Sequence, residues 1–392
     1  MQPKLIRITT VPISLKTLLK GQHRFMSQNG FEVLGISSSG NDLNEVAQNE
    51  KIVVDAVEMT RVISPLKDIK SLWNFYKLCK RERPTIVHSH TPKAGIVGML
   101  GAKLAGVPIR LHTVAGLPLM EATGRKRRLL DFVEKLTYWC TTKVYPNSKG
   151  LYDFILANNF TVEEKLKVIA NGSSNGIDTT YFSAQAITQE QIIMLKTGLG
   201  IHENDFLFIF VGRLVGDKGI NELITAFSNL KPESLNLKLL LVGPFESELD
   251  PLHPETLNAI TTNSNIISVG FQSDVRPYFA ISDCLVFPSY REGFPNVVMQ
   301  SGAMGLPSIV TDINGCNEII EDGVNGLIIP PKNSKALQMA MIKLVEDKEL
   351  YKNLKSNSRQ MITSRYEQKL VWEALLMEYQ TLLQEKGFVR NV

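Results

Sequence analysis

The sequence predicts an α/β protein with two doubly wound parallel-sheet domains of Rossmann type. Three observations predict this class. The chain has 392 residues, enough for two or three domains. Short apolar, β-branched runs alternate with helical patterns along the chain, which is typical of parallel strands buried on both faces. The series occurs twice, so we expect two such sheets that face each other across a cleft.

The composition is that of an ordinary globular protein. Apolar residues make up 44% and charged residues 21%, which excludes a disordered, collagen-like or coiled-coil chain. The cysteines are far apart and form no CxxC pair, so we expect reduced thiols, no zinc site and a cytoplasmic protein. No stretch approaches the ~18 apolar residues of a membrane span, and Met1–Ile6 runs straight into a strand, so we expect no signal peptide.

The expected first domain covers residues 1–185. The helix pattern is clearest after Ser64 and Pro65, a good N-cap and first-turn pair. Six apolar positions follow at helical spacing, and we expect them to form one stripe: Leu66, Ile69, Leu72, Trp73, Tyr76 and Cys79. The strands that we expect are Leu5–Ile8, Val33–Ile36, Thr85–His88, Ile109–Thr113 and Lys143–Tyr145.

The expected second domain covers residues 186–366, after a polar stretch at 181–185. A long helix from Glu367 to Lys386 follows it. The strands that we expect in this domain are Phe206–Val211, Leu237–Val242, Ile266–Val269, Cys284–Phe287, Ser308–Val310 and Leu327–Ile329.

The charge is uneven along the chain. Residues 1–180 hold 25 Lys and Arg against 15 Asp and Glu, a net charge of +10, whereas the remainder holds 18 against 24. The densest basic cluster is Arg125–Arg128, which is followed by apolar residues. Two interpretations stay open: a solvated helix face, or contact with a membrane surface or an anionic acceptor. Without a nucleic-acid-binding motif, we expect no nucleic acid partner.

Two motifs follow strands in the second domain, where α/β sheets bind ligands. Arg213 and Lys218 lie in GRLVGDKG and together suit a diphosphate, although a charged surface turn would read the same way. Glu292 lies in the loop before a helix that Pro295 opens, and its carboxylate suits sugar hydroxyls if it is not merely structural. The free N–H groups of that helix favour phosphate. Asn296 and Gln300 are one helical turn apart on it.

GRLVGDKG followed by REGFPNVVMQSGAMGLPSIVTD resembles the retaining family 4 glycosyltransferases of the glycosyltransferase-B fold. Two further segments, HTVAGLPLMEATGRKRRLLDFVEKLTY and TDINGCNEIIEDGVNG, are similar to bacterial enzymes of capsule, O-antigen or lipopolysaccharide assembly. The resemblance implies that a C-terminal helix, here 367–392, crosses back to the first, acceptor-binding domain.

The resemblance also implies roles for the matching residues. Arg213 and Lys218 would bind the donor diphosphate, and Glu292 would hold the donor sugar with the backbone of Gly293 and Phe294. Gln300 stands where most members have a glutamate that binds the nucleotide ribose. An amide can still bond a ribose hydroxyl but carries no charge.

The first domain contributes histidines. From the residues alone, a structural strand-end histidine is the favoured interpretation of His112, whereas the resemblance matches it to the family histidine near the donor sugar. His88 and His90 alternate along a strand and share a face, where packing or an acceptor-site role is preferred to a metal site. Asn147 is a further candidate for substrate contact.

The expected reaction is the retaining transfer of a hexosyl or N-acetylhexosaminyl group to a hydroxyl, with Glu292, His112, Arg213 and Lys218 as the catalytic set. No metal or other cofactor is expected, since there is no Asp-x-Asp motif and cations are present to neutralise the diphosphate. The resembling enzymes favour a UDP-sugar donor over a GDP-sugar. The expected acceptor is a lipid-linked saccharide at the cytoplasmic face of the inner membrane.

Three alternatives stay open. One is a nucleotide-sugar epimerase of the same fold, which the set of Arg213, Lys218 and Glu292 disfavours. Another is a catalytically weak nucleotide-sugar-binding protein, which only Gln300 indicates. The third is a synthase of the glycogen or sucrose type with a lipid-free acceptor.

Overall fold

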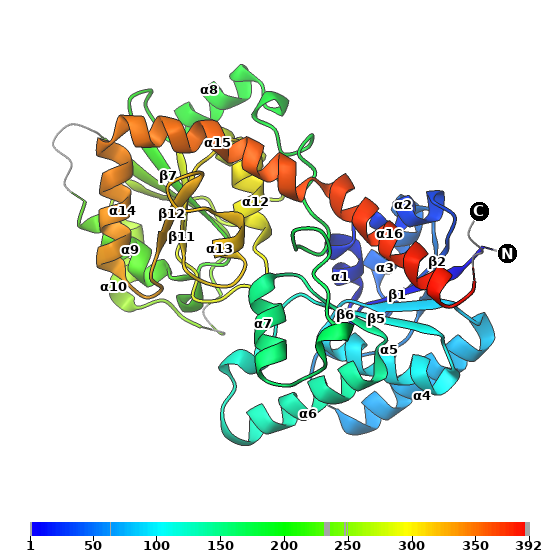
Figure 1. The fold of residues 1–392 in the computed structure, drawn as a ribbon. Helices are drawn as coiled ribbons and strands as arrows, with labels where there is room; N and C mark the ends of the chain where they lie inside the picture. The colour runs from blue at the N-terminus through cyan, green and yellow to red at the C-terminus, as the bar shows by residue number, and fades with distance from the viewer. Residues whose placement is uncertain (1, 63, 231–235, 247, 249, 389–392) are drawn as a thin grey trace. The chain divides into compact units, whose positions relative to one another are not determined.

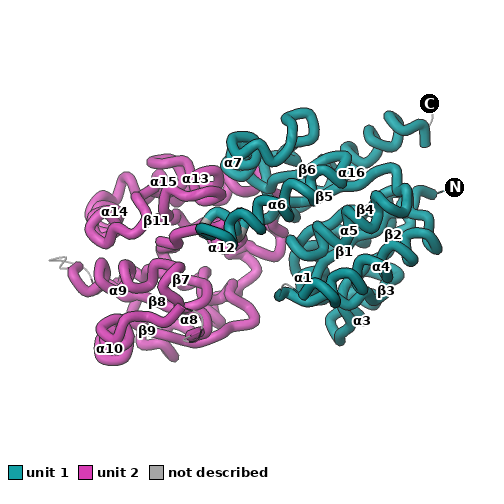
Figure 2. Tube along the Cα trace, turned by 90° about the horizontal axis from the view of Figure 1, so that it is seen from below, with its two compact units in different colours: residues 1–176, 368–392 teal, residues 177–367 magenta. Residues whose placement is uncertain are grey.

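The computed structural model describes residues 2–62, 64–230, 236–246, 248 and 250–388. Figure 1 shows the fold of these residues as a ribbon. The chain forms two compact units, unit 1 with Met1–Gly176 and Gln368–Val392, and unit 2 with Ile177–Glu367 (Figure 2). Each unit contains one six-stranded parallel sheet, so the predicted fold class is confirmed.

The sheet of unit 1 has the strand order β3-β2-β1-β4-β5-β6. The chain therefore begins in the middle of the sheet, builds out to one edge and then returns to build the other half. This is the doubly wound order, and its switch point lies between β1 and β4. The strands are β1 (Lys4–Ile8), β2 (Glu32–Ser37), β3 (Val53–Ala56), β4 (Ile86–Ser89), β5 (Ile109–Val114) and β6 (Lys143–Pro146).

Helices cover both faces of this sheet. Successive residues of β1 show why, since Leu5 belongs to the apolar cluster that includes Leu382 of α16, whereas Ile6 belongs to the cluster that includes Phe75 of α4. The helices of unit 1 are α1 (Pro12–Leu18), α2 (Gln22–Gln28), α3 (Asn41–Glu50), α4 (Pro65–Glu82), α5 (Pro92–Ala105), α6 (Gly124–Cys140), α7 (Lys149–Ala157) and α16 (Gln368–Glu385).

Strand β3 is absent from the sequence prediction. It forms the edge of the sheet and, within the described part of the chain, pairs only with β2. Its burial explains the omission, because Val53 and Ala56 are exposed and Asp55 interrupts the apolar run. A short edge strand with one open side lacks the continuous apolar pattern that identifies buried parallel strands.

The expected stripe on α4 is wrong in part. The helix does begin at Pro65 after Ser64. However, Leu66, Ile69 and Trp73 are 85%, 62% and 55% exposed. The buried face is Ser71, Phe75, Leu78 and Cys79. Phe75 packs so closely against α5 that a Cβ on Gly101 would lie 2.9 Å from its ring, and this contact selects the face that α4 buries.

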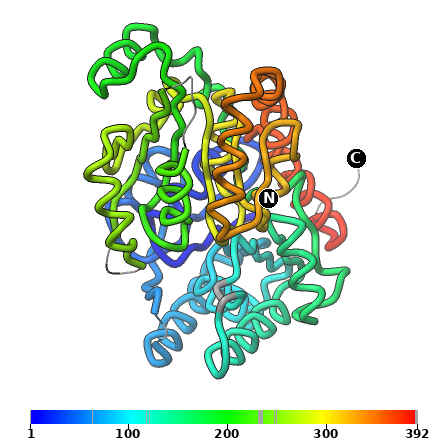
Figure 3. The backbone as a smooth tube through the Cα atoms, turned by 90° about the vertical axis from the view of Figure 1, so that its left-hand side faces the viewer, coloured from blue at the N-terminus to red at the C-terminus, as the bar shows by residue number. Residues whose placement is uncertain are grey.

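Unit 2 repeats the same doubly wound order, β9-β8-β7-β10-β11-β12, with its switch point between β7 and β10. Figure 3 follows its chain from green through yellow to orange. The strands are β7 (Phe206–Val211), β8 (Leu237–Val242), β9 (Ile266–Ser268), β10 (Cys284–Phe287), β11 (Ser308–Thr311) and β12 (Gly326–Ile329). The helices are α8 (Gln189–Gly198), α9 (Ile220–Ser228), α10 (Pro254–Thr262), α11 (Arg276–Ala280), α12 (Asn296–Ala303), α13 (Cys316–Ile319), α14 (Ser334–Glu346) and α15 (Lys348–Tyr366).

The division between the units lies at Gly176 and Ile177, before the boundary that we placed between 185 and 186. The segment after Ile177 is polar, but it belongs to unit 2 through backbone pairing and packing. The Ile177 N–H donates to the Tyr366 carbonyl at 2.8 Å, and Ile187 is buried in the unit 2 core. The C-terminal helix α16 belongs to unit 1 (Figure 2).

The cysteines Cys79, Cys140, Cys284 and Cys316 are all buried and free of disulfide bonds. Among the described residues, none of the helices has the length and apolar character needed to cross a membrane.

Candidate functional site

The switch point of the unit 2 sheet brings the two sequence motifs together. Gly212 and Arg213 directly follow β7, and Ser289 follows β10 by one residue. β7 and β10 are neighbours in the sheet, and the chain leaves them toward opposite halves. The carboxyl ends of adjacent strands at such a point are where doubly wound sheets bind ligands.

Gly219 allows the two loops to touch. It has φ +72°, in the left-handed region, and it is the residue before α9. A Cβ at this position would lie 2.1 Å from the carbonyl oxygen of Pro288, in the loop after β10. The neighbouring loops are also joined by a bond from the Tyr290 N–H to the Asp217 carbonyl, 2.9 Å long. The final glycine of GRLVGDKG therefore fixes where Lys218 lies relative to the second motif.

Lys218 and Glu292 form an ion pair, which joins the two motifs through their charged side chains. The side chains are only 16% and 17% exposed. The Ser289 hydroxyl donates to Glu292 Oε1 at 3.0 Å. Glu292 is therefore held from two sides at the carboxyl edge of the sheet, and it is not an isolated loop carboxylate.

Arg213 forms an ion pair with Glu246, with Nη1 and Oε2 2.8 Å apart. The hydrogen bond to Glu246 raises the pKa of Arg213, so the guanidinium stays charged. Sequence reasoning missed Glu246. The signal was its place shortly after β8, beyond the strand-end pair Gly243 and Pro244.

The remaining predicted residues lie around the start of α12, which begins at Asn296 directly after Pro295. Asn296 is exposed and Gln300 half-buried. The backbone of the loop is set by Asn314, which sequence reasoning missed: its Nδ2 donates to the Gly293 carbonyl at 2.6 Å.

Phe294 has a packing role. Its ring lies 5.4 Å from that of Tyr366, edge to face, and it is 9% exposed. Its side chain is thus occupied in packing, and the backbone contact with substrate that the resemblance implies stays a prediction.

In unit 1 the corresponding edge carries a buried group of histidines. His88 and His90 lie on the same face, as predicted, with ring centroids 4.1 Å apart. His88 bonds to Tyr379 of α16 at 2.6 Å and to Thr113 at 2.8 Å. The Arg7 Nε–H donates to His90 Nε2 at 3.1 Å.

Arg7 is another residue that sequence reasoning missed. It interrupts the apolar residues Leu5, Ile6 and Ile8 of β1, and it is completely buried. Such a charge is expensive to bury, so its position in the sequence was the signal. Desolvation lowers its pKa, but an arginine remains charged in proteins.

His112 lies on β5, and its Nδ1 is 2.8 Å from the Ser89 hydroxyl. Burial lowers the pKa of His112 to about 4, so the ring is neutral near pH 7. It packs against α5, where a Cβ on Gly95 would lie 2.7 Å from the ring. This environment fits both of the interpretations that the sequence left open.

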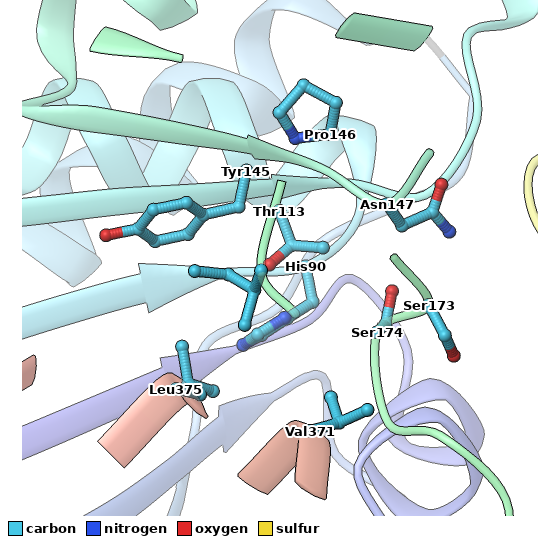
Figure 4. Close-up of a pocket in the computed structure, with 10 residues that line it drawn as sticks. His90, Thr113, Tyr145, Pro146, Asn147, Ser173, Ser174, Val371 and Leu375 are labelled. Atoms are coloured by element: carbon cyan, nitrogen blue, oxygen red, sulfur yellow. The ribbon is translucent and has the colours of Figure 1, made fainter. Parts of the chain in front are cut away.

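His90 and Asn147 line one small pocket at the carboxyl ends of β4, β5 and β6 (Figure 4). Its volume is about 20 Å³. Figure 4 shows Asn147, Ser173 and Ser174 gathered on one side, with Val371 and Leu375 of α16 below. His112 does not line this pocket. Among the described residues, no group of three or more His, Cys, Asp or Glu has a geometry that fits a metal ion.

Comparison with known proteins identifies the class. Residues 26–172 match the glycosyl transferase 4-like domain, and residues 194–361 match glycosyl transferases group 1. The protein therefore belongs to the glycosyltransferases that combine these two domains.

Full-length relatives agree with the domain matches. The chain is 32% identical to the capsular polysaccharide biosynthesis glycosyltransferase CapM of Staphylococcus aureus, over 97% of this chain and 98% of that one. It is 30% identical to an Escherichia coli UDP-Gal:α-D-GlcNAc-diphosphoundecaprenol α-1,3-galactosyltransferase, over 88% and 89% of the two chains. At these identities and coverages the chain is a member of the same family.

The fold agrees as well. The structure of Anabaena HepE in complex with UDP superposes with a TM-score of 0.80 at 18% identity, covering 97% of this chain and 100% of HepE. The fold is thus that of the glycosyltransferase-B class, as the sequence predicted.

Proposed function

We propose that the protein transfers a hexosyl or N-acetylhexosaminyl group from a UDP-sugar to a hydroxyl of a lipid-linked saccharide. One observation carries the proposal: Arg213, Lys218 and Glu292 lie at the switch point of the unit 2 sheet, with Lys218 paired to Glu292. A diphosphate needs cations, and a sugar needs a hydrogen-bond acceptor beside them. This site offers both.

The proposed chemistry uses no metal. The acceptor oxygen forms a bond to the anomeric carbon, and the bond from that carbon to the β-phosphate oxygen breaks. The proton of the acceptor hydroxyl passes to the departing phosphate oxygen on the same face, so the anomeric configuration is retained. Arg213 and Lys218 neutralise the charge that grows on the leaving diphosphate, and such preorganised charge is often the largest catalytic contribution.

UDP is the proposed nucleotide. Two findings support it: HepE was solved with UDP, and the E. coli relative is named for UDP-Gal. Gln300, half-buried on α12, is the residue that we propose for the ribose. Its amide donates as well as accepts, so it needs no cation near it.

A thermal-shift screen against UDP, GDP, ADP and their sugar conjugates tests this donor site. A ligand that binds only the folded state raises the melting temperature. We expect a rise with UDP compounds that EDTA leaves unchanged. A rise only with another nucleotide, or only with added metal, would contradict the assignment.

Retention is tested on the product. The anomeric proton in the NMR spectrum should show the configuration of the donor sugar, and an inverted linkage would exclude the proposed mechanism. The same assay without acceptor tests the epimerase alternative, because an epimerase would convert the donor sugar alone.

The lipid-linked acceptor is supported by the E. coli relative, which is named for a diphosphoundecaprenol-linked sugar. Unit 1 provides a surface that suits a membrane. On α6, Leu129 and Phe132 are 47% and 64% exposed beside the exposed Arg125, Lys126 and Arg128. Basic and apolar groups together on one helix bind anionic membrane surfaces. We therefore propose that the protein associates peripherally with the membrane that carries its acceptor.

Charge reversal tests the membrane contact. Arg125, Lys126 and Arg128 changed together to Glu should weaken binding to vesicles that contain anionic lipid. Arg127 is left in place because it forms an ion pair with Asp131 at 2.6 Å. The matched control reverses three exposed lysines of unit 2, Lys335, Lys348 and Lys352. Equal losses in both triple variants would mean that net charge, and not this helix, governs binding.

A further inference from the structure

The pocket in unit 1 contains polar atoms that the protein itself does not satisfy. Three of the residues that line it carry a solvent-inaccessible polar atom with no partner among the described residues: His90 Nδ1, Asn147 Oδ1 and Ser174 Oγ. His90 and Asn147 are only 4% and 6% exposed. Buried polar atoms in proteins are nearly always hydrogen-bonded, so three of them around one pocket point to a ligand.

The protonation of His90 is determined by its neighbour. The Arg7 Nε–H donates to His90 Nε2 at 3.1 Å, and an arginine can only donate. Nε2 is therefore the acceptor nitrogen, and the ring proton is on Nδ1. Burial, with Arg7 and His88 close by, lowers the pKa of His90 well below its usual value. The ring is neutral, and Nδ1–H remains as one hydrogen-bond donor.

Asn147 supplies a hydrogen-bond acceptor to the pocket. Its backbone N–H donates to the Val114 carbonyl at 3.0 Å, and its Nδ2 contacts the Ala115 carbonyl at 3.5 Å. Since the amide nitrogen is directed to the chain, Oδ1 remains as an acceptor. The Ser174 hydroxyl both donates and accepts.

The other polar groups of the pocket already have partners. Thr113 bonds to His88 at 2.8 Å, the Tyr145 hydroxyl donates to Glu378 at 3.1 Å, and Ser173 accepts from the Gly176 N–H at 3.1 Å. The tyrosine hydroxyl points away from Asn147 and Ser174 in Figure 4. One donor, one acceptor and one hydroxyl are thus what the pocket offers.

We propose that this pocket is a subsite for one neutral hydroxyl group, and that in the transfer complex the group is a hydroxyl of the acceptor saccharide. The volume of about 20 Å³ holds a single oxygen-sized group. A hydroxyl donates to Asn147 Oδ1 and accepts from His90 Nδ1–H, so it satisfies both atoms at once. The identity of the saccharide rests on the proposed function; the hydroxyl chemistry of the subsite does not. The second source of the same chemistry is a water molecule.

Asn147→Leu and Ser174→Ala test the subsite, because each removes one unpartnered polar atom at small cost in shape. The control is Ser358→Ala in unit 2, a buried serine whose hydroxyl already donates to the Leu354 carbonyl at 2.8 Å. The acceptor probe is α-D-GlcNAc-diphosphoundecaprenol, the saccharide named for the E. coli relative. We expect the acceptor KM to rise about tenfold in both unit 1 variants, the loss of about one hydrogen bond. UDP affinity should stay at the wild-type value, and the control should change neither.

The melting temperature and a crystal structure distinguish a saccharide hydroxyl from a water molecule. If Asn147→Leu leaves the acceptor KM unchanged but lowers the melting temperature, and a wild-type crystal structure shows water on His90 and Asn147, the hydroxyl is that of water and the saccharide assignment is wrong. If the acceptor KM is unchanged and the melting temperature is unchanged or higher, Asn147 Oδ1 has no ligand and the subsite is refuted. If wild-type protein transfers no sugar to the probe, the proposed acceptor fails instead, and the melting temperatures and the crystal structure still decide whether a hydroxyl is bound.

Discussion

The carboxyl edges of the two sheets carry different chemistry on the same topology. In unit 2 the strand ends present charged side chains that pair with each other, Arg213 with Glu246 and Lys218 with Glu292. In unit 1 they present neutral rings and amides, and the buried cation Arg7 bonds to His90 and Gln22 and, among the residues that the structure describes, to no carboxylate. The strand order is the same in both units.

Because the two units share one strand order, the burial of the strand-end residues, and not the fold, determines which ligand each edge suits. Partly exposed ion pairs can exchange a carboxylate for a phosphate, since water stabilises the displaced group. The residues that line the unit 1 pocket are neutral, and a charged ligand would lose its hydration there at a large cost, so the pocket suits hydroxyl groups. We therefore propose the unit 2 edge for the charged nucleotide donor and the unit 1 pocket for a hydroxyl of the sugar acceptor.

Acid should destabilise unit 1 more than unit 2, and this is the largest effect that we expect. Burial lowers the pKa of four unit 1 histidines: that of His23 to about 3, that of His112 to about 4, and those of His88 and His90 well below 6.5. The unfolded chain protonates these rings near pH 6.5 and the folded unit does not. Stability is therefore lost as the pH falls from 6.5 toward 4, by about 1.4 kcal/mol per pH unit for each ring.

One group opposes this loss. Burial raises the pKa of Glu134 to about 7, and its stabilising protonation grows as the pH falls. Its gain in stability offsets the loss that one of the four histidines causes. All three tryptophans lie in unit 1, at positions 73, 139 and 372, so tryptophan fluorescence reports the unfolding of this unit alone. Hydrogen exchange should show unit 2 still protected when the fluorescence changes. If unit 2 unfolds before unit 1 as the pH falls, the assignment of buried neutral histidines to unit 1 is wrong.

Glu292→Gln should have the next largest effect. It removes the charge paired with Lys218 while keeping the shape, and kcat/KM should fall by about 100-fold or more, the range for one group lost from a preorganised site. UDP should bind at least as tightly, because a negative charge beside the diphosphate is gone. Glu248→Gln, at an exposed position of the same unit, is the control. Full activity in the Glu292 variant would remove it from the catalytic set.

Gly219→Ala should weaken UDP binding through the backbone. The new Cβ would meet the Pro288 carbonyl at 2.1 Å, and φ is +72°. The loop must move, which displaces Lys218, and the melting temperature should fall by several degrees. Gly200→Ala is the matched control, since Gly200 has φ +63° but open space around its Cβ position. Similar losses of UDP affinity in both variants would mean that backbone strain alone, and not contact between the loops, accounts for the effect.

Glu246→Gln should change UDP binding at the unit 2 site by a smaller amount. The amide can still accept a bond from Arg213 but does not compete for it as an anion. UDP affinity, measured by calorimetry, should rise by about threefold at low salt, and the gain should shrink as salt screens the charges. Weaker binding would show that Glu246 contributes to the site as a ligand or orienting group rather than as a competitor of the diphosphate.

Sequence patterns predicted most of the sheet. Eleven of the twelve strands were expected from their apolar runs, and β3 was missed because an edge strand is half exposed. The buried face of α4 could not be predicted, since Leu66, Ile69 and Trp73 fit a helical stripe as well as Phe75 and Leu78 do. Tertiary contacts distinguish the two faces, because Phe75 and Leu78 pack in one apolar cluster with the sheet and α5.

Sequence motifs predicted that Arg213, Lys218 and Glu292 lie next to strand ends, and the structure places them there, with Lys218 paired to Glu292. Their roles in binding and catalysis stay predictions. Glu246 and Arg7 were not predicted, because each acts through a partner far away in the sequence. The Asn147 pocket also depends on α16, whose residues Val371 and Leu375 no local pattern connects to β6.

Hydrogen exchange of the full chain with and without UDP tests the central claim, that unit 2 holds the charged donor. We predict slower exchange at residues 212–219 and 289–300, with no change at 86–91 and 109–114 in unit 1. Protection by UDP confined to the unit 1 segments would contradict the account, because it would place the charged ligand at the edge built from neutral groups.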